Sequence, residues 1–85
     1  MVGGDKMKGD KEAIEICKRE EHKQYIGMQK FDISIRYIEN TAKGSFIYWI
    51  ESPLDSQEEI AHKSNLIKAD NNYYFYANGV KIEIN

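Results

Sequence analysis

Two side chains of reactive types stand close together in this sequence, Cys17 and His22. A nucleophilic cysteine needs a base within hydrogen-bond reach. In a helix, a separation of five residues turns the two side chains about 140° apart around the axis, so they do not face one substrate. Free cysteine is also among the most buried residue types. Cys17 is therefore interpreted as a small member of an apolar helix stripe.

The sequence also contains no recognisable metal or phosphate site. One cysteine and two distant histidines, His22 and His62, lack the spacing of a metal-ligand set, and both histidines are expected to be solvated in charged neighbourhoods. Gly3, Gly4 and Gly9 lack the Gly-Lys-Ser/Thr run of a phosphate loop. No two of the fourteen acidic residues stand out as a catalytic pair. We expect no enzymatic activity, no cofactor and no metal.

Charge and composition narrow the class of protein further. Twelve basic and fourteen acidic residues give a net charge of −2, which argues against a dedicated nucleic-acid binder. The single cysteine cannot form an intrachain disulfide, as is typical of a reducing compartment. No apolar run approaches the roughly 20 residues of a membrane span, and no signal peptide is evident. A cytoplasmic protein without membrane association is expected.

The clearest structural signal is at the carboxyl end, where alternating apolar residues flank Asn78-Gly79. This pair favours a type I′ turn, which fixes the register of a β-hairpin formed by residues 73–77 and 80–84. Tyr73, Phe75 and Ala77 would then oppose Ile84, Ile82 and Val80 on one apolar face. The other face would carry Tyr74 and Tyr76 against Lys81 and Glu83.

A second hairpin is predicted from the alternating residues 31–37 and from residues 46–51, joined by a loop that contains Gly44. Its register would pair Tyr37 with Tyr48 and Ile38 with Ile47. The same register would pair Ile35 with Ile50 and Arg36 with Trp49, and a loop one residue shorter or longer would flip or shift it.

Two helices complete the predicted fold. Asp10 is a suitable N-cap for a helix over residues 11–24, and Asp55 or Ser56 with Glu58 or Glu59 forms a capping-box pattern before a short helix at 57–64. We therefore predict one α+β domain over residues 10–85, preceded by a flexible leader at residues 1–9. It would have an antiparallel sheet of four or five strands in two hairpins, with the first helix on one face and the second between the hairpins.

The strongest functional signal is a predicted surface rather than a reactive group. If both hairpins join one sheet, the side away from the main core gathers large aromatic, aliphatic and basic residues. Trp, Tyr and Arg commonly anchor binding hot spots. The competing interpretation is that this side is covered within the chain and that Trp49 belongs to a second small core. The candidate partner-binding residues are Arg36, Ile38, Ile47, Trp49, Tyr74, Tyr76 and Lys81.

The sequence thus favours a small non-enzymatic interaction module of the inhibitor or adaptor kind that phages and other mobile elements carry. Its partner would be a protein or a second copy of the chain, with Ile47 and Trp49 at the centre of a homodimer interface. The alternative is single-stranded nucleic acid stacked on Trp49 and the hairpin tyrosines, with Arg36, Lys43 and Lys81 at the phosphates.

Overall fold

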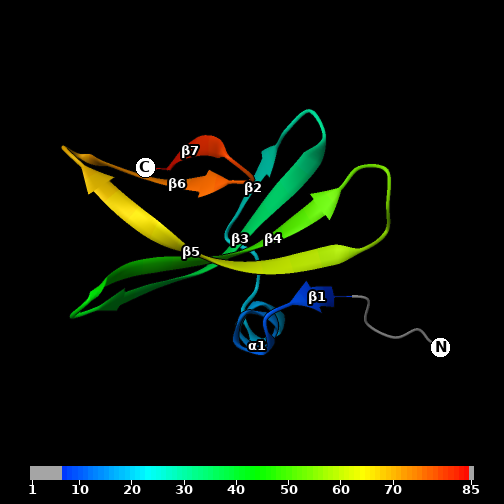
Figure 1. Ribbon diagram of the computed structural model, residues 1–85, viewed down its shortest axis with the longest axis horizontal. Coiled ribbons are helices and arrows are strands. Elements are labelled where there is room, and N and C mark those ends of the chain that lie inside the picture. The colour runs from blue at the N-terminus through cyan, green and yellow to red at the C-terminus, as the bar shows by residue number, and fades with distance from the viewer. Residues whose placement is uncertain (1–6, 85) are drawn as a thin grey trace.

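The computed structural model describes residues 7–84, which form a single curled sheet of seven strands and one helix of nine residues (Figure 1). The predicted fold, with four or five strands and two helices, is wrong in both respects, because the segment predicted as a second helix is a long strand. The elements are β1 (Met7–Gly9), α1 (Lys11–Arg19), β2 (Gln24–Gly27), β3 (Phe31–Thr41), β4 (Gly44–Pro53), β5 (Glu59–Ala69), β6 (Asn72–Ala77) and β7 (Val80–Ile84).

The sheet curls into a half-barrel through strand β5. The strand order is β2-β3-β4-β5-β6-β7 with antiparallel neighbours, and β1 pairs in parallel with the start of β5. Residues 60–66 of β5 pair with β4, and residues 67–69 pair with β6. Figure 1 shows β5 curving from the layer beside α1 to the layer of the β6–β7 hairpin. One strand therefore belongs to both layers.

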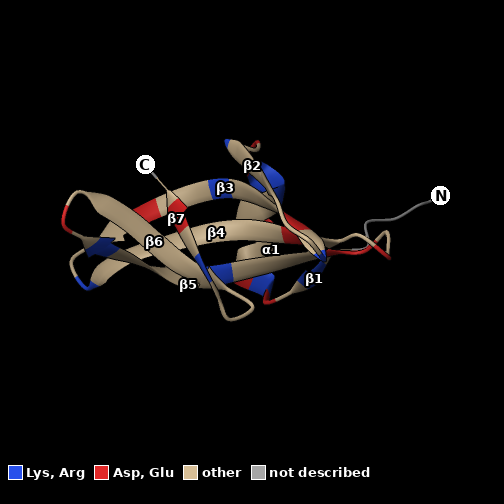
Figure 2. Ribbon diagram, turned by 90° about the horizontal axis from the view of Figure 1, so that it is seen from above, with Lys and Arg blue, Asp and Glu red and all other residues tan. Residues whose placement is uncertain are grey.

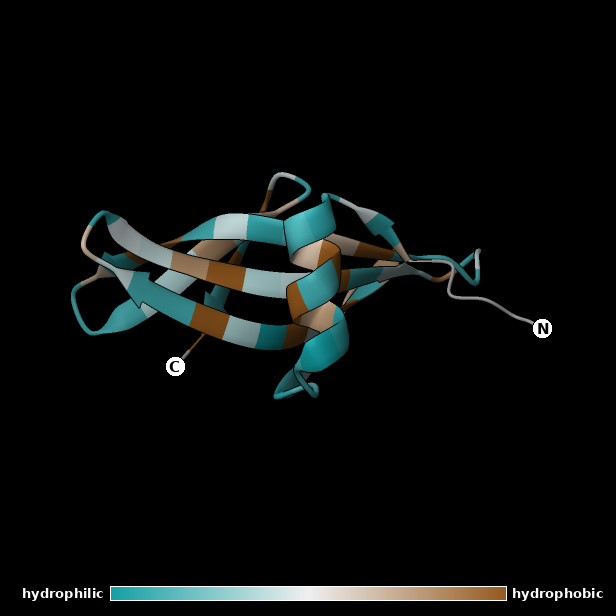
Figure 3. Cartoon of the chain, turned by 90° about the horizontal axis from the view of Figure 1, so that it is seen from below, coloured by the Kyte–Doolittle hydropathy of each residue, from teal (hydrophilic) through white to brown (hydrophobic). Residues whose placement is uncertain are grey.

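Two apolar cores lie on opposite sides of β3 and β4. The inner core fills the space between these strands and the β6–β7 hairpin, and it consists of Ile33, Ile35, Ile47, Trp49, Leu66, Phe75, Ala77, Ile82 and Ile84. The helix-side core lies beneath α1, which crosses the other face of the sheet in Figure 3. It consists of Ala13, Cys17, Tyr48, Ile50 and Ala61.

The β6–β7 hairpin has the register that the sequence predicts. Ala77 pairs with Val80, Phe75 with Ile82, and Tyr73 with Ile84. Asn78 and Gly79 have φ values of 52° and 82°, as a type I′ turn requires. The prediction was correct because this turn fixes the register locally, without help from the rest of the chain.

The β3–β4 hairpin agrees with its predicted register only near the turn. Tyr37 pairs with Tyr48 and Ile38 with Ile47, but a bulge at Arg36 shifts the remainder, so that Ile35 faces Trp49. Because Arg36 is an extra residue in β3, the side chains of residues 31–35 point to the opposite sides of the sheet from those that uninterrupted pairing would give. The predicted pairs Ile35 with Ile50 and Arg36 with Trp49 are therefore wrong.

Within the segment 57–64, residues 59–64 belong to β5, and no helix forms there. Ser56 Oγ accepts a hydrogen bond from the Glu58 amide at 3.0 Å, so the residues interpreted as a capping box close a turn before the strand. His62 and Ser64 occupy inward positions of β5. Because both residues are polar, the strand lacks the regular alternation of apolar and polar residues that would predict it. Pairing with β4 on one side and with β1 and β6 on the other overrides the local helix signal.

Helix α1 ends at Arg19, five residues before the predicted end, and the chain then forms β2. The Arg36 guanidinium Nη1 donates hydrogen bonds to the carbonyls of Cys17, at 2.7 Å, and Glu20, at 3.0 Å. These carbonyls lie at the end of the helix, where no further helical amide can reach them. The bulged residue therefore stabilises the carboxyl end of α1.

Residues 7–9 of the predicted leader form β1, while residues 1–6 lie outside the described part of the chain. Gly9 of β1 has a φ of 125° and approaches Ala61 of β5 closely. Among residues 7–84, no helix is long and apolar enough to cross a membrane.

Candidate functional site

The seven residues predicted to share one binding surface are distributed over four regions. Ile47 and Trp49 lie in the inner core, and Arg36 lies on the α1 side of the sheet. Tyr74, Tyr76 and Lys81 remain together on the outside of the β6–β7 hairpin. Ile38 is exposed near the end of β3. The bulge and the fold of the hairpin over β3 and β4 separate the residues.

Trp49 is only 1% exposed and is surrounded by groups of its own chain. Its ring stacks on His62 at 4.2 Å between centroids and meets Phe75 at 5.5 Å, while Nε1 donates a hydrogen bond to Ser64 Oγ at 3.0 Å. Ile47 is fully buried beside it. These two residues cannot be the centre of a homodimer interface, because the chain's own hairpin covers them.

The outer tyrosine face is the exposed side of the hairpin and is formed by Tyr74, Tyr76 and Lys81. The two rings meet edge to face with centroids 5.8 Å apart, and the Lys81 ammonium lies 4.4 Å from the centre of the Tyr74 ring. Tyr76 is 51% exposed. Figure 2 views the molecule from this side and shows basic and acidic residues interspersed along its strands. The face is aromatic and of mixed charge.

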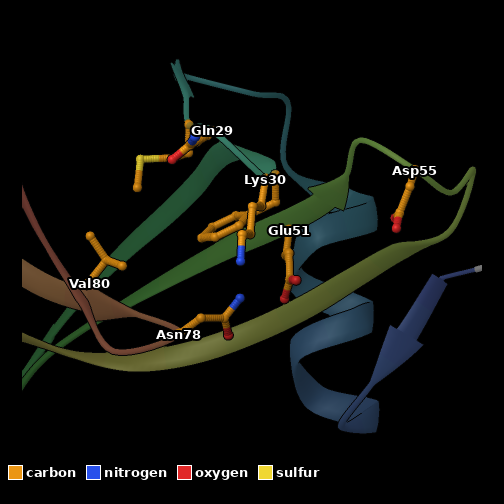
Figure 4. Close-up of a pocket in the computed structure, with 8 residues that line it drawn as sticks. Gln29, Lys30, Glu51, Asp55, Asn78 and Val80 are labelled. Carbon is orange, nitrogen blue, oxygen red and sulfur yellow. The ribbon is translucent and has the colours of Figure 1, made fainter.

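A second feature, missed in the sequence, is an open pocket of about 750 Å³ at one end of the half-barrel. We call it the mouth pocket. It lies between the β2–β3 turn, the end of β4 and the β6–β7 turn. Figure 4 shows the polar ends of Lys30, Glu51 and Asn78 directed into the same space. The lining residues are Met28, Gln29, Lys30, Phe31, Glu51, Asp55, Asn78 and Val80.

Glu51 at the base of this pocket is held by His62. His62 Nε2 lies 2.9 Å from Glu51 Oε1, and the two side chains are 29% and 14% exposed. His62 is therefore partly buried and partnered, contrary to the prediction that it is solvated. Its inward position becomes recognisable only when residues 59–69 are assigned to a strand, so the wrong helix prediction also concealed this pair.

Cys17 lies on the other side of the sheet, within the helix-side core. Its thiol donates to the Trp49 carbonyl at 3.7 Å. Burial raises the pKa of Cys17 to about 11, against a partial lowering by the nearby Arg36 guanidinium. His62 faces the opposite side of the sheet, beside the Trp49 ring. The fold does not bring the cysteine and this histidine together.

The buried thiol gives the protein a specific sensitivity to alkali. The folded state binds the Cys17 proton more tightly than the unfolded chain, whose thiol titrates near 9.0. The neutral thiol therefore stabilises the folded state fully below pH 9, and this contribution is lost as the pH rises towards 11. The loss in the free energy of unfolding is on the order of 2 kcal/mol. Urea unfolding of wild type and Cys17→Ala at pH 8 to 11 should show the extra loss only in the wild type. Parallel curves for the two proteins would contradict this assignment.

The described residues contain no group of three or more potential metal ligands. Comparison with known proteins finds no matching family model, curated protein or solved structure. Two surfaces of the molecule are candidate binding sites, the outer tyrosine face and the mouth pocket.

Proposed function

We propose that this protein is a small non-enzymatic interaction module that binds another protein through the outer tyrosine face. The observation that carries the proposal is the cluster of Tyr74, Tyr76 and Lys81 on the outward face of the β6–β7 hairpin, where Tyr76 is 51% exposed. Tyrosine combines a large contact area with a hydroxyl and loses little conformational freedom on binding. A suitable partner offers apolar groups to the rings and a carboxylate to Lys81.

The rigid support beneath the face favours this function. Phe75 and Ala77 alternate with the two tyrosines along β6 and are fully buried in the inner core. The type I′ turn and the register with β7 fix the positions of the outward side chains. A preorganised aromatic pair avoids part of the entropy that a flexible surface loses when it is bound.

Single-stranded nucleic acid is less well supported as the ligand. The Arg36 guanidinium bonds to the end of α1, and Trp49 is buried, so two of the residues expected to contact nucleic acid point elsewhere. Glu83 also lies on the same face of β7 as Lys81. The tyrosine pair alone, next to a carboxylate, lacks the basic track that follows a phosphate backbone.

The proposal is tested by comparing partner binding in three proteins: wild type, the double variant Tyr76→Ala and Lys81→Glu, and Tyr25→Ala. Tyr25 is 63% exposed on β2 and serves as a matched control at a different place. A partner captured from the native cell extract and then purified should bind the double variant at least about tenfold more weakly, which corresponds to about 1.4 kcal/mol. The control should bind like wild type.

Equal partner affinities for wild type and the double variant would exclude the outer tyrosine face as the binding surface. Oligo(dT) titrations at 20 and 200 mM salt test the alternative. Tight binding with a steep salt dependence would favour nucleic acid as the ligand.

A further inference from the structure

The half-barrel has an open seam. The sheet begins at β2 and ends at β7, and within residues 7–84 no strand pairs with the free edge of β7. Side chains from the β2 end, including Ile26 and Met28, nevertheless pack against the inner core that contains Ile82 and Ile84. The interior is therefore closed by side chains, while the backbone of β7 remains unpaired along the seam.

The turn geometry identifies which backbone groups face this seam. In a hairpin with a two-residue turn, the residues that flank the turn form a hydrogen-bonded pair, and such pairs then alternate along the strands. From the observed register, Val80, Ile82 and Ile84 direct their amides and carbonyls to β6. Lys81 and Glu83 consequently direct theirs away from β6, along the free edge.

The edge is flanked by a pocket at each end. Val80 lines the mouth pocket, and Ile84 lines an end pocket of about 200 Å³ together with Ile38, Asn40, Leu66 and Tyr73. Four residues of a strand span about 13 Å. A new strand beside β7 would place its side chains i and i+4 opposite Val80 and Ile84, both on the inner side of the sheet. The spacing of the pockets matches one extended segment.

The two pockets differ in chemistry. The end pocket is lined mainly by apolar side chains and suits an aliphatic residue. The mouth pocket has apolar walls from Met28, Phe31 and Val80, and it carries the carboxylates of Glu51 and Asp55 against the single ammonium of Lys30. Apolar walls and a net negative lining suit a long basic side chain, whose stem is apolar and whose end is cationic.

We propose that an extended segment of a partner protein adds to the edge of β7 as an antiparallel strand. It places an aliphatic side chain in the end pocket and an arginine or lysine four residues later in the mouth pocket. Strand addition to a free sheet edge is a recurrent mode of peptide recognition. A second copy of β7 fits less well, because its own Val80, Ile82 and Ile84 already face its inner core and cannot fill the pockets.

A labelled synthetic peptide, Thr-Leu-Thr-Val-Thr-Arg-Thr, provides the probe, and fluorescence anisotropy measures its affinity. Glu83→Pro removes an edge amide that β6 does not use, and proline is tolerated on edge strands. We expect this variant to bind the peptide at least tenfold more weakly than wild type, while Glu83→Ala, which keeps the amide, stays within twofold. Lys30→Ala should bind more tightly, and Asp55→Asn more weakly.

A second probe leaves the protein unchanged in case the proline variant fails to fold. N-methylation of the two threonines that flank valine blocks the peptide amides facing β7 and should abolish binding, whereas N-methylation of the valine should not. No binding at millimolar peptide, or equal binding by both methylated peptides, would overturn the proposal. So would a wild-type dimer that Glu83→Pro dissociates, because β7 would then pair with itself.

This peptide site uses the edge of β7 and does not require the outer tyrosine face. Tyr76→Ala should leave peptide affinity within twofold of wild type. A tenfold loss in Tyr76→Ala together with full binding by Glu83→Pro would place the peptide on the tyrosine face and overturn strand addition.

Discussion

Replacing Trp49 with alanine is expected to lower the free energy of unfolding by about 3–5 kcal/mol. The indole is 1% exposed, stacks on His62, contacts Phe75 and bonds to Ser64, so its removal leaves a cavity at the centre of the inner core. Small domains have only about 5–15 kcal/mol of total stability. Urea unfolding followed by circular dichroism measures the loss.

Trp49→Phe is the matched control. It keeps an aromatic ring beside Phe75 but loses the hydrogen bond to Ser64 and part of the volume, so a loss of about 1–2 kcal/mol is expected. A loss under about 1 kcal/mol in Trp49→Ala would contradict the central position of this residue.

Gly9→Ala is expected to destabilise the protein by about 3 kcal/mol or more, because a backbone strain and a collision coincide. Gly9 has a φ of 125°, and an added Cβ would lie 2.3 Å from the Ala61 carbonyl oxygen. That oxygen belongs to the backbone of β5 and cannot move without disturbing the sheet. The expected result is a lower unfolding midpoint together with faster amide exchange in β1.

Gly44→Ala separates the two causes. Gly44 has a similar φ of 137°, but an added Cβ would meet no atom within 4 Å. This variant should therefore show the strain alone, about 1–2 kcal/mol. Equal losses at the two glycines would mean that the contact with Ala61 contributes nothing.

The sequence was most informative where structure is determined locally. Asn78-Gly79 alone fixes the turn and register of the last hairpin, and Tyr37 pairs with Tyr48 as predicted because the pair lies close to its own turn. The bulge at Arg36 has no comparable local signal. It depends on a contact between the guanidinium and the end of α1, which is distant in sequence.

The candidate site was predictable only in part for the same reason. The tyrosines and Lys81 share a face because one hairpin carries them, so their proximity follows from local register. The mouth pocket brings Phe31, Glu51 and Asn78 together from three separate turns or strands, and no spacing in the sequence encodes that. The wrong helix prediction at 57–64 also explains why the inward position of His62 was missed. Residues that lie on one face of a helix lie on different faces of a strand, so the helical periodicity did not place His62 in the interior.

The bulge makes the two sides of β3 depend on how many residues the strand contains. A chain that lacked Arg36 would pair β3 with β4 without interruption and in the observed register, so Ile33 and Ile35 would still face the inner core. Removing Ile35 together with Arg36 would instead place Ser34 opposite Trp49 and turn Ile33 away from the inner core. When sequences are aligned with this one, a single-residue gap at Arg36 therefore keeps the two sides of the sheet, whereas a two-residue gap there exchanges them in the first half of β3.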